Sequence, residues 1–299
     1  MNVLKRMILL FPPVKNLYKE LTYLRNENER LNSEKLIREQ YHEQQESLLH
    51  LQKKAALNEC IVEKIYDSTV GEKGYCNICD NVVRVFLPFG NTPRENAECP
   101  YCGSLERHRL LWYYIKHNTN MLNDSIDTSI KVLHFAPETI LQKKISKFKY
   151  IDYYPVDINP SHIGIRDVID IESIKFHDNT FDYIICYHVL EHVADDLMAM
   201  KELIRVLKKD GIVFIEVPTN NIDTTYENPE FNTPELRLQH YGQDDHVRMY
   251  GNDFSQKLSE TGFIVEEIDL SKDLTSQELY SYGISMSKTI CSPYKCTIM

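Results

Sequence analysis

Four of the eight cysteines fall into two C-x-x-C pairs, a pattern that binds metal ions. The pairs are Cys76 with Cys79 and Cys99 with Cys102, in the spacing C-x2-C-x19-C-x2-C. This spacing is typical of a zinc ribbon, in which four thiolates close the coordination sphere of a structural zinc ion. We therefore predict a zinc module over residues 67–104. Four reduced core cysteines, or a redox C-x-x-C, are the alternatives.

Two aspartates stand at the ends of separate predicted strands. Asp157 ends the segment YYPVD, about 20 residues after the turn of KVLHFAPE, and Asp170 ends the segment DVID. A carboxylate at this distance from the first turn of a nucleotide-binding sheet binds ribose hydroxyls. The alternative for either residue is a solvated carboxylate at the end of a strand.

Two histidines belong to an H-x-x-E-H sequence formed by His188, Glu191 and His192. This is the inverted zinc-protease signature, which needs both imidazoles on one helical face with the glutamate as base. Here the sequence begins at the end of an apolar strand. A zinc hydrolase with a second, open zinc site therefore stays as an alternative with little support from its context.

The elements that must position these residues alternate between strands and helices from residue 130 onward. The predicted strands span residues 132–135, 153–157, 167–170, 183–187, 213–217 and 263–269. An amphipathic helix and an Asp210-Gly211 turn are predicted before the fifth of them. This alternation is typical of an α/β protein with a doubly wound sheet.

A long helix precedes the zinc module. Residues 14–66 contain no Gly or Pro, and Leu17, Leu21, Leu24 and Leu31 form an a/d seam. Residues 1–66 are therefore predicted to be a long helix with a short coiled coil, which gives a homo-oligomer or binds a partner helix. A solitary solvated helix is the alternative. Residues 7–11 are an apolar run flanked by Lys5, Arg6 and Lys15. The segment 3–11 therefore suits contact with a membrane surface, a partner helix or the protein itself.

Composition narrows the classes of function. The formal net charge is -10 with a pI near 5.6, which argues against broad binding of nucleic-acid phosphates. No apolar stretch has the length of a membrane span, and no cleavage site follows the apolar run near the start. With the metal pattern of the cysteines, we expect a reducing, cytoplasmic location, with a membrane-peripheral position open through residues 3–11.

The segments DNTFDYIICYHVLEHV and RVLKKDGIVFIEVP together resemble the core of class I, Rossmann-like S-adenosylmethionine-dependent methyltransferases. The pieces CPYCGSLERHRLLW, VLHFAPE and GQDDHVRMYG, in this order, resemble a bacterial group in which a zinc ribbon precedes such a domain. The resemblance implies a seven-stranded methyltransferase sheet over residues 105–299. It also implies S-adenosylmethionine as methyl donor and, by analogy, an acceptor in surface-polysaccharide synthesis, such as a sugar hydroxyl.

The resemblance also implies roles for the strand ends. Asp157 would bind the donor's ribose hydroxyls, Asp170 the adenine amino group, and the Ile171 backbone the adenine ring. The methionine end of the donor would be held by residues 134–138, including His134, Ala136 and Glu138, with Tyr187 and His188 beside it.

The donor turn departs from the family's glycine-rich pattern. Ala136 and Glu138 stand where glycines usually let the backbone approach the ligand. Glu138 could pair with the donor's ammonium group. A catalytically inactive scaffold or regulator that has kept the fold is the alternative.

The acceptor is expected to bind the polar and aromatic segment 219–251, because loops after the carboxyl ends of strands carry substrate-binding residues. Transfer to a hydroxyl needs a general base, for which His246 is our first candidate and His188 our second. The candidate acceptor-binding residues are His240, Asp245, Arg248 and Tyr250. Each histidine could instead be structural, and Arg248 could pair with a neighbouring carboxylate.

Overall fold

The computed structural model describes residues 74–90, 93–124, 129–219, 222–285 and 293–298, with a few positions between 20 and 31. The chain divides into two units, Met1–Val70 and Gly71–Met299. The described positions of the first unit are helical, and its Leu21, Leu24 and Leu31 are 53%, 57% and 50% exposed. The rest of the predicted long helix, and the predicted contact through residues 3–11, lie outside the described residues.

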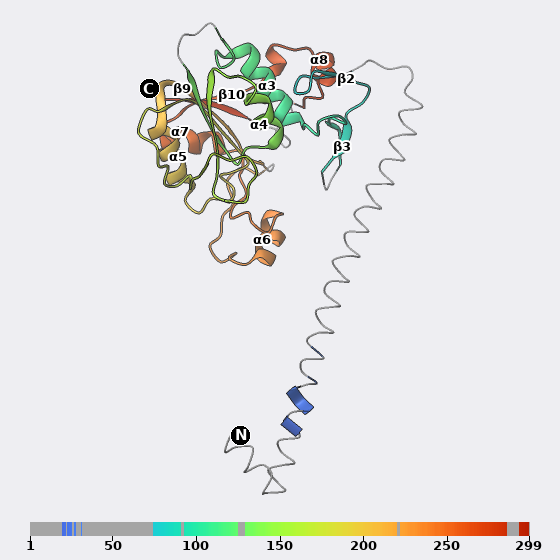
Figure 1. Ribbon diagram of the computed structural model, residues 1–299, viewed down its shortest axis with the longest axis vertical. Coiled ribbons are helices and arrows are strands. Elements are labelled where there is room, and N and C mark those ends of the chain that lie inside the picture. The colour runs from blue at the N-terminus through green and yellow to red at the C-terminus, as the bar shows by residue number, and fades with distance from the viewer. Residues whose placement is uncertain are drawn as a thin grey trace, which may run out of the picture. The chain divides into compact units, whose positions relative to one another are not determined.

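A seven-stranded mixed sheet forms the centre of the second unit (Figure 1). Its strands are β5 (Ile130–Phe135), β6 (Ile151–Asp157), β7 (Asp167–Val168), β8 (Phe181–Tyr187), β9 (Leu207–Glu216), β10 (Ile264–Glu267) and β11 (Tyr294–Thr297). Their order across the sheet is β10-β11-β9-β8-β5-β6-β7. The five strands β9, β8, β5, β6 and β7 are parallel to one another. Strand β11 is antiparallel to both β9 and β10. The sheet expected from the sequence is therefore present.

Six α-helices are described in the second unit. They are α3 (Glu106–Asn118), α4 (Thr139–Ile145), α5 (Asp196–Val206), α6 (Pro234–Tyr241), α7 (Phe254–Thr261) and α8 (Ser276–Ser281), with a 3-10 turn η1 (Leu270–Lys272). Of these, α3, α4, α5 and α7 pack on the sheet. Among the residues that the structure describes, none of the helices is long and apolar enough to cross a membrane. Figure 1 shows α6 standing apart from the sheet, on the segment that follows β9.

The two faces of the sheet bury separate cores, because the central strands are apolar on both sides. On one face Val132 of β5 and Ile185 of β8 pack with side chains of α3 and α4. On the other face Leu133 of β5 and Ile184 of β8 pack with side chains of α5 and α7. This double cover leaves the carboxyl ends of the parallel strands as the place where a ligand can reach the sheet.

Two small hairpins form the cysteine module. One pairs β1 (Gly74–Cys76) with β2 (Asn81–Val83), and the other pairs β3 (Leu87–Phe89) with β4 (Arg94–Glu98). The module is fixed to α3 by Arg109, which is fully buried. Its guanidinium donates hydrogen bonds to the carbonyls of Ala97 at 2.6 Å and Tyr282 at 2.8 Å, and also to those of Ser104 and Gly283.

One local expectation was wrong, and one strand of the sheet was missed. The Asp210-Gly211 dipeptide lies inside β9 rather than in a turn, because the pairing with β8 shifts between Phe181 and Tyr183. Gly211 is needed for close packing, since a Cβ there would lie 2.8 Å from Cδ1 of Leu207. Strand β11 was not predicted, because its four residues acquire partners only from β9 and β10.

Candidate active site

A cavity of about 680 Å³ opens at the carboxyl ends of β5, β6, β7 and β8. From β5 the chain continues to β6 and β7, toward one edge of the sheet. It then crosses over to β8, which pairs with β5 on the side opposite to β6. This is the topological switch point, where α/β sheets bind their ligands. Of the residues predicted from the sequence, six line the cavity: Ala136, Asp157, Asp170, Ile171, His188 and Asp245.

Asp157, at the end of β6, is held in place by the loop that follows it. Its Oδ1 accepts a hydrogen bond from the backbone N–H of Asn159 at 2.7 Å, and its Oδ2 lies 2.6 Å from Nδ1 of His162. The other ring nitrogen of His162 lies 3.2 Å from the carbonyl oxygen of Pro137, in the turn after β5. His162 therefore links the predicted ribose-binding carboxylate to the predicted donor turn, and the sequence did not single it out.

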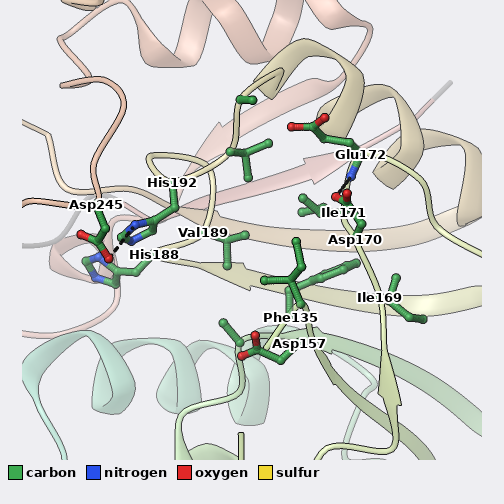
Figure 2. Close-up of a pocket in the computed structure, with 14 residues that line it drawn as sticks. Phe135, Asp157, Ile169, Asp170, Ile171, Glu172, His188, Val189, His192 and Asp245 are labelled. Carbon is green, nitrogen blue, oxygen red and sulfur yellow. Dashed lines mark hydrogen bonds and ion pairs between the residues drawn. The ribbon is translucent and has the colours of Figure 1, made fainter. Parts of the chain in front are cut away.

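Asp170, Ile171 and Glu172 form another part of the lining, on the side away from Asp245 in Figure 2. Asp170 Oδ1 accepts from the backbone N–H of Glu172 at 2.9 Å, which fixes the carboxylate in a tight turn. Glu172 Oε1 in turn accepts from the backbone N–H of Asp195 at 2.9 Å, and Asp195 caps α5. The predicted adenine-binding segment is thus tied to the end of the loop that follows β8.

The turn after β5 keeps a glycine-like backbone although it contains alanine. Ala136 has φ +43°, in the left-handed region that glycine occupies without strain. Its N–H donates to the carbonyl oxygen of Val156 in β6 at 2.9 Å, and the residue lines the cavity. The replacement of glycine has therefore left the path of the backbone open to a ligand.

Glu138 does not line the cavity; its carboxylate lies against histidines from two elements. Oε1 is 3.2 Å from Nε2 of His108 in α3, and Oε2 is 3.5 Å from Nε2 of His134 in β5. Burial on its own raises the pKa of Glu138, but the hydrogen bond from His108 and the nearby imidazole of His134 outweigh it and hold that pKa well below its usual range. The expectation that Glu138 pairs with the donor's ammonium is therefore not supported, since the carboxylate is already engaged on the side of α3. His134 and Tyr187 are buried and also lie outside the lining.

His188, His192 and Asp245 form the second side of the cavity (Figure 2). The ring nitrogens of His188 lie 3.3 Å from Glu191 and 3.8 Å from Glu216. Burial lowers the pKa of His188, but the hydrogen bond to Glu191 and the charge of Glu216 outweigh it, so the pKa is raised. His192 Nδ1 lies 3.2 Å from Asp245 Oδ2. The pairing of His192 with Asp245 joins residues far apart in the sequence, so only the fold reveals it.

Three of the predicted acceptor-side residues lie away from the cavity lining. Arg248 is 1% exposed and donates to the carbonyls of Leu190 at 2.7 Å and Ala194 at 3.0 Å, while also pairing with Glu227. Arg248 thus holds the loop after β8, because its guanidinium group bonds to the carbonyls of this loop and to Glu227. The hydroxyl of Tyr250 donates a hydrogen bond to Asp196. The ring of His240 stacks on that of Phe231, with the ring centroids 3.8 Å apart.

His246, the first candidate for the general base, is 6% exposed and packs edge-on against His192, with ring centroids 4.7 Å apart. Burial lowers the pKa of His246, and the charge of Glu191, which acts to raise it, offsets this effect only in part. His246 is not among the residues that line the cavity.

The H-x-x-E-H sequence does not have the geometry of a zinc protease. His188, Glu191 and His192 lie in the irregular segment between β8 and α5, so the two imidazoles do not share one helical face. The side chains that do converge are those of Glu191, His192 and His246. The hydrolase alternative is therefore not supported by the fold.

The four cysteines of the two C-x-x-C pairs converge on one point. Their sulfur atoms lie within 4.8 Å of one another, with Cys76 and Cys102 at 3.7 Å and Cys79 and Cys99 at 3.8 Å. Four sulfurs around one tetrahedral zinc ion at the usual bond length are roughly 3.8 Å apart. All four cysteines are free thiols. The cluster is compatible with zinc and fits its geometry closely.

The fold and the cavity define a Rossmann-like α/β domain with a crevice for a nucleotide-type ligand. A family model described as a methyltransferase domain matches residues 108–268. The chain therefore belongs to the methyltransferase domain family, and it is an S-adenosylmethionine-dependent methyltransferase. The comparison with curated proteins found no match.

Several solved structures are similar to this chain. The YcgJ protein from Bacillus subtilis is 17% identical over 60% of this chain and 97% of its own, with a TM-score of 0.39. An S-adenosylmethionine-dependent methyltransferase from Aquifex aeolicus is 17% identical over 57% and 84%, with a TM-score of 0.37. A phosphoethanolamine N-methyltransferase from Haemonchus contortus, in complex with S-adenosylhomocysteine, is 15% identical over 64% and 53%, with a TM-score of 0.41. The family assignment rests on the matched residues and not on these similarities.

Proposed function

We propose that this methyltransferase transfers the methyl group of S-adenosylmethionine to a hydroxyl oxygen of a glycan acceptor in surface-polysaccharide synthesis. The observation that supports it most is the make-up of the cavity, which joins two strand-end carboxylates to a wall of imidazole and carboxylate groups. The first feature suits a nucleoside donor and the second a polar acceptor whose proton must be removed. The choice of a glycan follows the sequence resemblance.

The donor would lie across the ends of β5, β6 and β7. Asp157, ordered by His162 and Asn159, has a carboxylate at the cavity to accept from the ribose hydroxyls. Asp170 and Ile171 line the same cavity, where they would bind the adenine. The methionine end would pass over the left-handed turn at Ala136. Because this turn leaves the cavity open, the inactive-scaffold alternative loses its main argument.

The reaction needs one bond exchange. A lone pair of the acceptor oxygen forms the new O–CH₃ bond while the sulfonium S–CH₃ bond breaks, and its electron pair stays on sulfur as the thioether of S-adenosylhomocysteine. The hydroxyl proton would pass to the imidazole of His188, the general-base candidate that lines the cavity. Much of the rate enhancement of such a transfer comes from holding donor and acceptor in line.

We also propose a structural zinc ion in the cysteine cluster. Cys76, Cys79, Cys99 and Cys102 would bind it with all positions filled, so it would stabilise the module without taking part in the reaction. The exposed leucines at positions 21, 24 and 31 support a further proposal, that the N-terminal helix pairs with a second copy or a partner helix.

The function is tested by methyl transfer from S-adenosylmethionine labelled in its methyl group. The acceptor probe is the surface-glycan fraction of a source strain that lacks the gene, and the Asp157→Ala protein is the control. We expect label in O-methyl sugars with the wild type and not with the variant. Label only in protein, RNA or N-methyl products would contradict the glycan acceptor.

A further inference from the structure

Three potential metal ligands converge beside the donor cavity. Side-chain ligand atoms of Glu191, His192 and His246 lie within 4.8 Å of one another. Glu191 and His192 follow β8, whereas His246 comes from the segment after α6. The two segments are joined by a hydrogen bond from the backbone N–H of Val247 to the carbonyl oxygen of Glu191, at 2.9 Å.

Glu191 is a buried carboxylate with one oxygen unsatisfied. The residue is 1% exposed, and its Oε1 lies 3.3 Å from Nδ1 of His188. Its Oε2 is buried, and no hydrogen-bond partner for it occurs in the part of the chain that the structure describes. A buried charged oxygen without a partner is costly, and a bound cation removes that cost.

His192 is oriented as a metal-binding histidine would be. Its Nδ1 lies 3.2 Å from Asp245 Oδ2, so the ring N–H is directed at a carboxylate. Its Nε2 then lies on the side of Glu191, 3.9 Å from Oε1. A carboxylate on the outer nitrogen is the usual arrangement for an imidazole that binds a metal through the other one.

We propose that Glu191, His192 and His246 hold a divalent first-row transition-metal ion, whose open positions take the hydroxyl oxygen of the methyl acceptor. Two imidazoles and one carboxylate are the ligands of such ions rather than of Mg²⁺ or Ca²⁺. Ligand atoms on one ion lie roughly 3.3 Å apart. The three ligand atoms lie within 4.8 Å of one another, with 3.9 Å between His192 Nε2 and Glu191 Oε1. They therefore need to close by at most about 1.5 Å to share one ion.

The site borders the donor cavity through one of its three ligands, since His192 lines the cavity whereas Glu191 and His246 do not. His192 and its partner Asp245 line the donor cavity, and Figure 2 shows them together on one side of it. An acceptor hydroxyl on the ion would therefore lie at the cavity, where the ion makes it more acidic before it attacks the methyl group. This inference rests on the proposed function. It replaces the expected role of His246 as general base by that of a metal ligand.

The test uses Co²⁺ added to full-length protein whose cysteine cluster already holds zinc. Visible absorption follows the ion, because a Co²⁺ bound to thiolates has charge-transfer bands that an imidazole and carboxylate site lacks. The variants are Glu191→Gln and Asp245→Asn, and Glu260→Gln, on the exposed face of α7, is the matched control. Calorimetric titration with S-adenosylhomocysteine accompanies each protein and reports the donor site separately.

We expect one added Co²⁺ per chain without thiolate bands in the wild type and the control. Asp245→Asn should weaken Co²⁺ binding by about tenfold, and Glu191→Gln by roughly 100-fold, since one orients a ligand and the other is one. Donor binding should persist in both variants. Absence of Co²⁺ binding, binding only with thiolate bands, or equal binding by Glu191→Gln would overturn the metal site while leaving the methyltransferase intact. Failure of the wild type to bind S-adenosylhomocysteine would instead contradict the proposed function.

Discussion

The carboxylate of Glu138, in the turn after β5, lies 3.2 Å from Nε2 of His108 in α3. Nδ1 of the same ring accepts from the backbone N–H of Leu105 at 3.0 Å, so the ring proton is on Nε2 and is donated to Glu138. Leu105 follows the second C-x-x-C pair closely. His108 therefore connects the cysteine module to the turn that bounds the donor cavity.

This connection predicts a pH dependence of stability. Burial lowers the pKa of His108, which the hydrogen bond to Glu138 offsets only in part. A histidine whose folded-state pKa is below its unfolded value of 6.5 stabilises the fold above that value, and this contribution is lost as pH falls below it. His108→Gln keeps a donor for Glu138 but cannot titrate. Between pH 7 and pH 5, the Tm of the variant should fall less than that of the wild type; equal slopes would contradict the assignment.

Loss of zinc should disturb the donor site as well as the module. Cys99→Ser removes one of four ligands, so the module and the start of α3 should loosen together. We expect loss of bound zinc, a lower Tm and weaker binding of S-adenosylhomocysteine. Cys296→Ala, in β11, is the matched control and should lower Tm while keeping zinc. Full donor affinity in zinc-free Cys99→Ser would show that the module does not support the donor turn.

The left-handed backbone at Ala136 predicts that glycine is tolerated at this position and valine is not. Ala136→Gly relieves the strain but gains freedom in the unfolded chain, so the free energy of unfolding should change by less than about 1 kcal/mol. Ala136→Val places a β-branched side chain at φ +43° and should cost at least about 1–2 kcal/mol. Chemical denaturation measures both. Equal tolerance of glycine and valine would be inconsistent with this turn.

Arg248 separates a structural role from an acceptor-binding role. Arg248→Lys cannot satisfy the loop carbonyls of Leu190 and Ala194 together with Glu227, so we expect a loss of about 2–4 kcal/mol in unfolding free energy. Arg166→Lys, in a surface pair with Asp152, is the control and should cost under about 1 kcal/mol. An Arg248→Lys protein of normal stability with a raised KM for acceptor would restore the acceptor-binding role predicted from the sequence.

The sequence predicted what depends on local pattern. The C-x-x-C pairs, the apolar strands β5 and β8, and the aspartates that end their strands all carry short-range signals. The directions of side chains could not be predicted from the sequence. Glu138 contacts His108 instead of lining the cavity, and this contact joins two elements that are far apart in the sequence. His162 was missed because its role depends on a turn that brings it back to Asp157. His192 was considered only within a zinc-protease motif, since its partner Asp245 follows more than 50 residues later.

The central claim is that the cavity binds the methyl donor through Asp157, and calorimetric titration of the zinc-loaded protein with S-adenosylmethionine and S-adenosylhomocysteine tests it most directly. Asp157→Ala removes the carboxylate at the cavity, whereas Asp152→Ala removes one on the same strand that pairs with Arg166 on the surface. We predict binding of both ligands by the wild type and by Asp152→Ala, and a loss of roughly 10- to 100-fold in Asp157→Ala. Absence of binding by folded wild-type protein, or equal affinity of Asp157→Ala, would contradict this account of the donor site.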